Sequence, residues 1–90
     1  MFDERELQKL RHRGMRLRWL RREILHMTVA EFALLCDRNN FVIGAWEQAR
    51  ISGLTPKSAR LIVGALEKTT VQCSDVWLLY GRGLGPSLRA

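Results

Sequence analysis

The stretch MTVAEFALLCDRNNFVIGAWEQA, residues 27–49, decides the fold, because it holds the signals for two short helices joined by a tight turn. Thr28 followed three residues later by Glu31 is a capping box, which predicts a helix over residues 28–36. The segment DRNN then supplies turn residues, and Asn39 can cap the free N–H groups of the helix that follows. The two helices are therefore expected to be close neighbours.

The second helix, expected over residues 40–48, has an apolar inner face and few polar groups on its outer face. Ile43 and Trp46 are three residues apart, which predicts that both belong to the core. Phe41 lies on the opposite side, where an exposed apolar residue indicates contact with DNA, a protein partner or a second copy. Gly44 offers no side chain there.

Residues 3–25 carry leucines and an isoleucine at helical spacing among many cationic side chains, which predicts a first, cationic helix. Gly14, with its low helix propensity, makes the middle of this predicted helix less stable. Either it separates an N-terminal basic extension, residues 1–13, from the first core helix, or it marks a close packing contact. The arginines between positions 11 and 22 form either a solvated helix face or a basic surface for an anionic membrane or an acidic partner.

The second half of the chain contains signals for two more helices. ARISGL has no helical period, but Thr55 followed by proline is a helix start and predicts a helix over residues 56–68. Ser74 can cap a last short helix over residues 75–80, which the glycine-rich GRGLGP then ends. The pattern predicts five helices and no strand.

Ninety residues suffice for one hydrophobic core, so we expect a single all-α domain over residues 14–80 and a C-terminal tail over 81–90. The net charge of +6 favours a polyanionic partner. Basic residues outnumber acidic ones by eight to four over 1–26 and by six to two over 50–90, but not over 27–49, where three acidic residues meet one arginine. Positive charge therefore brackets an acidic middle.

The sequence indicates neither a catalytic nor a metal site. Cys36 and Cys73 lack metal-ligand spacing and are expected to be small buried hydrophobes in a reduced, cytoplasmic compartment. His12 and His26 are expected at the surface or satisfied by hydrogen bonds. No nucleophilic set or phosphate-binding loop is present, so we expect neither an enzyme nor a cofactor. The apolar runs are too short to cross a membrane.

Residues 27–49 resemble, without a gap, the helix-turn-helix of the Cro and lambda-repressor-like family, also called the xenobiotic-response-element family. The matches are Thr28, Ala33, Ile43, Trp46 and Glu47. RLRWLR is similar to that family's first helix, with one residue more than usual before Thr28, and VWLLYGRGLGP is similar to its fifth helix and exit. The resemblance implies a five-helix, lambda-repressor-like helix-turn-helix domain.

That resemblance implies a transcriptional regulator, a repressor rather than an activator, that binds double-stranded DNA as a homodimer on an inverted repeat. Half-sites would lie roughly 34 Å apart. Leu78, Leu79 and Tyr80 are candidates for the dimer contact, and Trp19 and Trp77 for core or dimer contacts. The alternative is a protein-interaction module on the same scaffold: an antitoxin, anti-repressor or regulatory subunit.

Position by position, the resemblance implies which residues meet DNA. Asn40 can bond an adenine edge, and Phe41 can contact a thymine methyl group. The full base-contacting set is Asn40, Phe41, Gly44 and Ala45. Phosphate contacts are expected from helix starts and loops, at Thr28, Val29, Arg38, Asn39, Arg50, Ser52, Lys57 and Ser58. The family's ion pair between first and third helices would join Glu47 to Arg21, or to Arg22 because of the extra residue.

Four positions depart from the family pattern. Val29 replaces a glutamine, and Asp37 and Ala49 replace glycines. Arg38 replaces a buried valine, so the turn either repacks or directs an arginine outward toward DNA.

Overall fold

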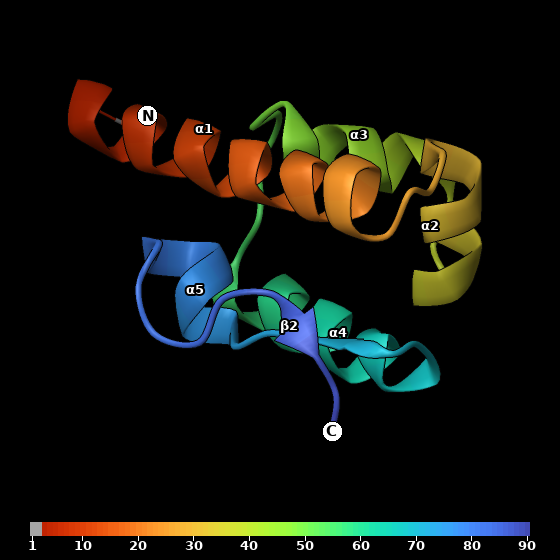
Figure 1. Ribbon diagram of the computed structural model, residues 1–90. Helices are drawn as coiled ribbons and strands as arrows, with labels where there is room; N and C mark the ends of the chain where they lie inside the picture. The colour runs from red at the N-terminus through yellow and green to blue at the C-terminus, as the bar shows by residue number, and fades with distance from the viewer. Residues whose placement is uncertain (1–2) are drawn as a thin grey trace.

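The computed structural model describes residues 3–90, which form two layers of helices (Figure 1). α3 lies alongside α1, α2 stands at the end of this pair, and α4 and α5 form the second layer. The described chain is thus mainly helical. Its α-helices are α1 (Glu4–Trp19), α2 (Val29–Cys36), α3 (Asn40–Glu47), α4 (Pro56–Ala65) and α5 (Asp75–Tyr80). Shorter elements are π-helical η1 (Leu20–Ile24), the 3-10 turn η2 (Leu66–Lys68), β1 (Val71–Gln72) and β2 (Ser87–Leu88).

The helix signals around the central turn are confirmed. The Thr28 hydroxyl accepts a hydrogen bond from the Glu31 amide at 3.1 Å, and the Glu31 carboxylate accepts one from the Thr28 amide at 2.9 Å. Asn39 caps α3 by accepting from the Val42 amide at 3.0 Å. Asp37, in place of the family's glycine, adopts the left-handed conformation with φ of 55°. Asp tolerates this conformation better than most residues, so the turn closes without glycine.

The C-terminal segment differs from the expected tail. Residues 81–90 return to the body of the protein, where β2 pairs antiparallel with β1, matching Leu88 to Val71. The Arg89 guanidinium also donates to the Leu66 carbonyl at 3.1 Å. Strands of two residues are too short to show an alternating pattern, so the sequence carried no signal for them. The helix predicted over 56–68 is also shorter, because its last three residues form the 3-10 turn η2.

The first helix is continuous through Gly14, so no break separates residues 4–13 of the predicted extension from the domain; residues 1 and 2 lie outside the described residues. A Cβ atom at Gly14 would lie 2.2 Å from the carbonyl oxygen of Glu47, at the end of α3. The glycine is therefore explained by close packing of two helices. Leu10, within the supposed extension, is itself buried.

The core lies between the two layers and takes residues from every α-helix. Trp46 is 7% exposed, which confirms its expected place in the core. Leu78 and Leu79 are also buried, so they are not available for the dimer contact expected of them, whereas Tyr80 is exposed. The largest fully buried side chains are Phe32, Leu17, Leu20, Ile43, Leu54, Ile62, Leu66 and Leu78.

Some arginines of α1 bind backbone carbonyl groups instead of facing only solvent. Arg13 donates to the carbonyls of Leu79 and Leu54, both at 3.1 Å, and Arg16 donates to Leu78 at 3.0 Å. Leu78 and Leu79 lie in the last turn of α5, where free carbonyls and the helix dipole favour a cation. These arginines join α1 to the second layer. The sequence had indicated either a solvated helix face or a basic surface for a partner, and neither interpretation included this role.

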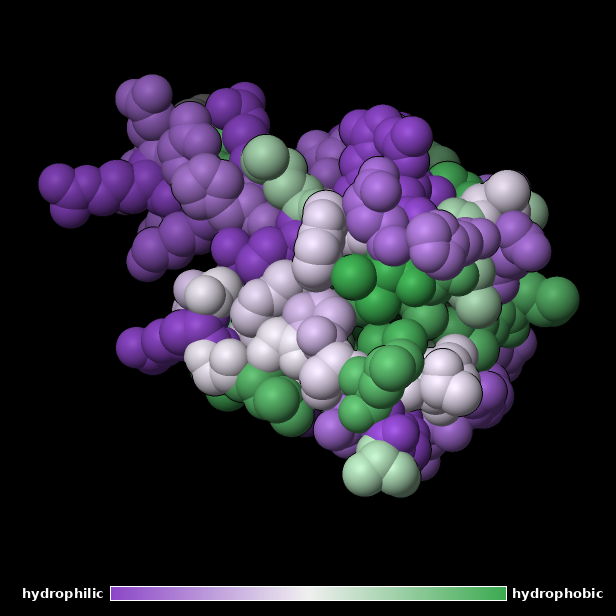
Figure 2. All heavy atoms as spheres, in the orientation of Figure 1, coloured by the Kyte–Doolittle hydropathy of each residue, from purple (hydrophilic) through white to green (hydrophobic). Residues whose placement is uncertain are grey.

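The surface is hydrophilic over the N-terminal part of α1 and more hydrophobic between the two layers (Figure 2). Within residues 3–90, no helix combines the length and apolarity needed to cross a membrane.

We predict that Gly14→Ala destabilises the protein by about 3 kcal/mol or more, because the new Cβ meets backbone and the two helices must separate. Gly64→Ala is the matched control, since its Cβ meets no atom within 4 Å. That control should raise stability by up to about 1 kcal/mol through helix propensity. Urea denaturation measures both, and equal stability of the two variants would contradict the packing account.

Candidate nucleic-acid interface

A buried ion pair fixes α3 against the end of the first helix. The Arg21 Nε donates to Glu47 at 2.6 Å and Nη2 donates to the other carboxylate oxygen at 3.0 Å. Both side chains are less than a tenth exposed. A third donor, Nη1, bonds the Met27 carbonyl at 2.9 Å. This two-point geometry holds the planes of both groups in one orientation.

The π-helical turn η1 explains why Arg21 makes this pair and Arg22 does not. A π turn accommodates one extra residue within a helix. The sequence has one residue more than the family pattern before Thr28, and η1 lies in that segment. Arg21 consequently points inward and is buried, whereas Arg22 is exposed.

The outer face of α3 contains three of the four expected base-contacting residues. Asn40 and Phe41 are exposed, Phe41 by 60%, and Gly44 is partly exposed. Ala45 is only 6% exposed, and it lines the hollow beside Phe41 and Arg50. The chain after α3 folds back here, and the Ala45 carbonyl accepts a hydrogen bond from the Arg50 amide. The assignment of Ala45 as a base-contacting residue stays a prediction.

The loop after α3 contains an unusual series of left-handed residues. Ala49, Ile51 and Gly53 have φ of 56°, 58° and 59°. Ala49 stands where the family pattern has glycine, and the structure gives it the conformation that favours glycine. A β-branched residue such as Ile51 is disfavoured in this conformation, and its side chain is 75% exposed. The loop is thus strained at residues that flank Arg50.

Arg50 lies across the outer face of α3. Its guanidinium carbon is 5.2 Å from the centre of the Phe41 ring. A Cβ atom on Gly44 would lie 2.9 Å from Nη2 of Arg50, so the guanidinium occupies the space that any other residue would fill. The sequence predicted that Arg50 contacts a phosphate. Its position on the outer face of α3 follows from the geometry of the loop, which the sequence did not indicate.

A shallow hollow connects α3 to the start of α4. Its volume is about 230 Å³, and its lining includes Phe41 and Arg50 on one side and Thr55 and Ser58 on the other. Thr55 caps α4 by accepting from the Ser58 amide, and the first turn contains no acidic residue. Lys57 is exposed in that turn, and Ser52 also lines the hollow. Pro56 has no N–H and the Ser58 amide donates to Thr55, so the Lys57 amide is the donor that this first turn can offer. That amide, the Lys57 side chain and the positive helix end suit this region to a phosphate group.

The start of α2 is less suited to an anion. The Thr28 amide, an expected phosphate donor, already donates to Glu31, and this hydrogen bond lowers the pKa of the Glu31 carboxyl group. A carboxylate therefore occupies the positive end of the helix. Val29 retains a first-turn amide that has no partner within the helix. The Asn39 side-chain oxygen is used in capping α3, and the exposed Arg38 donates from Nη1 to the Asp37 carbonyl at 2.8 Å.

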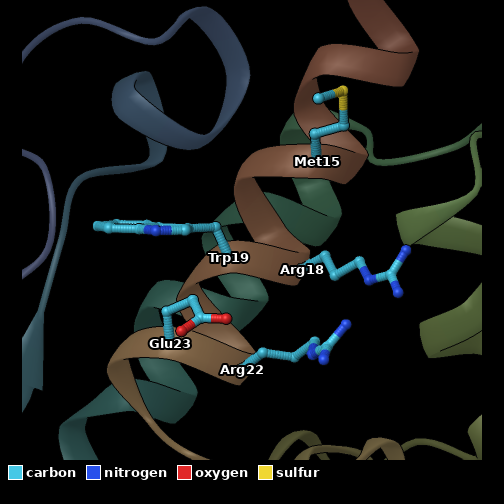
Figure 3. Close-up of a pocket in the computed structure, with 5 residues that line it drawn as sticks. All are labelled: Met15, Arg18, Trp19, Arg22 and Glu23. Atoms are coloured by element: carbon cyan, nitrogen blue, oxygen red, sulfur yellow. The ribbon is translucent and has the colours of Figure 1, made fainter.

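A second hollow, about 340 Å³ in volume, lies on α1 and η1 and is lined by Met15, Arg18, Trp19, Arg22 and Glu23. Figure 3 shows Arg18 and Arg22 extending to one side of the helix and Trp19 and Glu23 to the other. The Trp19 ring is about half exposed and lies 6.0 Å, between ring centres, from Trp77 of α5. This surface is apolar with a charged border.

The reactive groups of the chain form no catalytic arrangement in the described residues. Cys36 and Cys73 are buried, and burial raises the pKa of each thiol to about 11. His12 and His26 are exposed. Over residues 3–90, no three His, Cys, Asp or Glu side chains gather as metal ligands would.

No protein-family model matches the chain, and neither a curated protein nor a solved structure is significantly similar to it.

We predict that Glu47→Leu and Arg21→Met each destabilise the protein by about 3 kcal/mol, because each leaves one buried charge without its partner. The double variant should lose clearly less free energy of unfolding than the two single variants lose together, since neither buried charge remains. Urea denaturation of the four proteins measures the coupling. Glu67→Leu, at an exposed position, serves as the control. Additive losses would contradict the assigned pair.

Proposed function

We propose that this protein binds double-stranded DNA as a transcriptional regulator, through a lambda-repressor-like helix-turn-helix formed by α2 and α3. The observation that carries the proposal is the continuity of the outer face of α3 with the start of α4 through one hollow. A groove-binding helix and a phosphate-binding helix start are thereby presented on one surface. The net charge of +6 agrees with a polyanionic partner.

In this proposal α3 enters the major groove and α2 crosses the backbone. Asn40 is at the first turn of α3, where residues of such helices meet base edges. Ser52 and the side chain and amide of Lys57 contact phosphates, which position the protein without specifying sequence. Arg38 and the Asn39 amide group supply a second phosphate contact at the turn.

We further propose that the protein acts as a homodimer on an inverted repeat, and as a repressor. A single module covers few base pairs, and two modules on one face of DNA bind half-sites one turn apart, roughly 34 Å. With Leu78 and Leu79 in the core, the exposed apolar side chains near α5 include those of Trp19, Val76, Tyr80 and Leu84.

A salt titration tests DNA binding. The purified chain is titrated with the DNA upstream of its own gene and with a random duplex, at several salt concentrations. We expect affinity to fall steeply with salt and to favour the upstream DNA. Lys57→Ala should weaken binding to both duplexes and reduce the slope of log affinity against log salt concentration by about one. Asn40→Ala should instead change which sequence is preferred.

Lys9→Ala, an exposed lysine on α1, is the control for Lys57→Ala and should leave the salt slope and the affinity for both duplexes close to those of the wild type. Weak and equal binding to both duplexes, with little dependence on salt, would contradict the proposal.

The second candidate is a protein-interaction module on the same scaffold. It is favoured by the apolar exposure of Phe41 and Ile51, 60% and 75%, on the surface proposed for DNA. A protein partner would bury these side chains and would not require the salt dependence of phosphate contacts. The same titration therefore separates the two candidates.

A further inference from the structure

We infer that Arg50, from the loop after α3, is the principal base-contacting side chain and donates to a guanine in the major groove. The inference rests on the proposed DNA-binding function and deepens it. It assigns the main base contact to a loop side chain that packs on α3, instead of to a side chain of α3 itself.

Few side chains of α3 can form hydrogen bonds with base edges. From Asn40 to Glu47 only these two residues have polar side chains, and Glu47 is committed to its buried pair with Arg21. Base edges are distinguished by donors and acceptors, which Phe41 and Gly44 do not offer. A recognition surface built from α3 alone would therefore have Asn40 as its single polar contact.

Arg50 supplies the missing donors on the same face. Its guanidinium packs over the Phe41 ring and over the bare backbone at Gly44. Phe41 and Gly44 are one helical turn apart, and both lie on the outward side of α3. A glycine at position 44 has a specific use here, because a Cβ would displace the guanidinium. Phe41 and Gly44, which offer no hydrogen-bonding side chain, thus form the surface on which the Arg50 guanidinium packs.

The backbone holds Arg50 in this position. Its amide donates to the Ala45 carbonyl at 3.0 Å, and its carbonyl accepts from the Gly53 amide at 2.9 Å. The left-handed residues Ala49 and Ile51 on either side reverse the chain direction. Strained conformations persist where surrounding structure enforces them, often at functional sites. The cation–π contact with Phe41 further restricts the side chain.

The chemistry of the guanidinium selects guanine. Its planar fork presents parallel N–H donors, which match O6 and N7 on the major-groove edge of guanine. A lysine at this position retains the charge but lacks the planar fork that stacks on Phe41 and matches O6 and N7 in one plane, so its contact with guanine is weaker. Charge and base recognition can therefore be separated by one substitution.

The test is selection of bound duplexes from a random library by the wild-type protein and by two variants. We expect the wild-type consensus to contain a guanine, favoured by about tenfold, at one position of each half-site. Arg50→Lys should lose most of that preference, because an ammonium lacks the planar fork, while keeping its affinity for random duplex and its salt slope. Gly44→Ala should weaken the same preference, because its Cβ displaces the guanidinium and leaves the helix intact.

Two matched controls isolate the effect. Arg82→Lys removes a guanidinium that also stacks on an aromatic ring, that of Tyr80 at 5.6 Å, and Gly64→Ala adds a methyl group to a helical glycine in open space. Both should keep the wild-type consensus. Circular dichroism checks that each variant is folded.

The outcomes distinguish this inference from the proposed function. A wild-type protein that enriches no sequence overturns both. A wild-type consensus that Arg50→Lys retains overturns only the role of Arg50, which would then be a phosphate contact as the sequence had suggested. Loss of the guanine in Arg50→Lys and its weakening in Gly44→Ala, with both controls unchanged, supports the inference.

Discussion

The attachment of α3 to the first helix is the constraint on which the rest of the structure depends. Two contacts set it, and both involve Glu47. Its backbone carbonyl lies against Gly14, and its carboxylate is bound by Arg21 in the buried pair. The first fixes the distance between helices, and the second fixes rotation and register. Buried pairs are more dependable for orientation than for net stability.

This attachment determines what α3 can present. Once Glu47 faces α1, the helical repeat turns Ile43 and Trp46 into the core and leaves Phe41 and Gly44 outside. The chain must then leave α3 at a defined place, and the loop through Ala49 and Ile51 carries Arg50 back across the outer face. A helix with almost no polar side chains can thus support a charged surface, because the loop after it provides the cation.

Much of the helical architecture was predictable because its signals are local. The capping residues Thr28 and Asn39 lie within three positions of the amides they bind, and the spacing of Ile43 and Trp46 reports burial directly. The resemblance named Arg21 as the partner of Glu47, with Arg22 as the alternative, and the structure contains the Arg21 pair. The π turn η1 beside it has no distinct sequence pattern, so that turn could not be predicted.

The features that sequence reasoning missed depend on distant partners. Arg13 and Arg16 bind carbonyls more than sixty residues away, at the end of α5. The strand formed by Ser87 and Leu88 exists only because β1 is beside it. The placement of Arg50 follows from left-handed residues that are not glycine, which propensity does not foresee. Glycine at 44 was no clear signal for this packing, because Gly64, another glycine within a helix, has no atom close to it.

The most direct test of the account is nuclear magnetic resonance of the labelled protein during titration with an enriched duplex. The account predicts that the largest changes in amide chemical shift occur in α3, in residues 48–53 and in the first turn of α4. If the amides of these three segments stay unchanged while those around Trp19 and Trp77 shift, the outer face of α3 is not the DNA-binding surface, and the central claim is wrong.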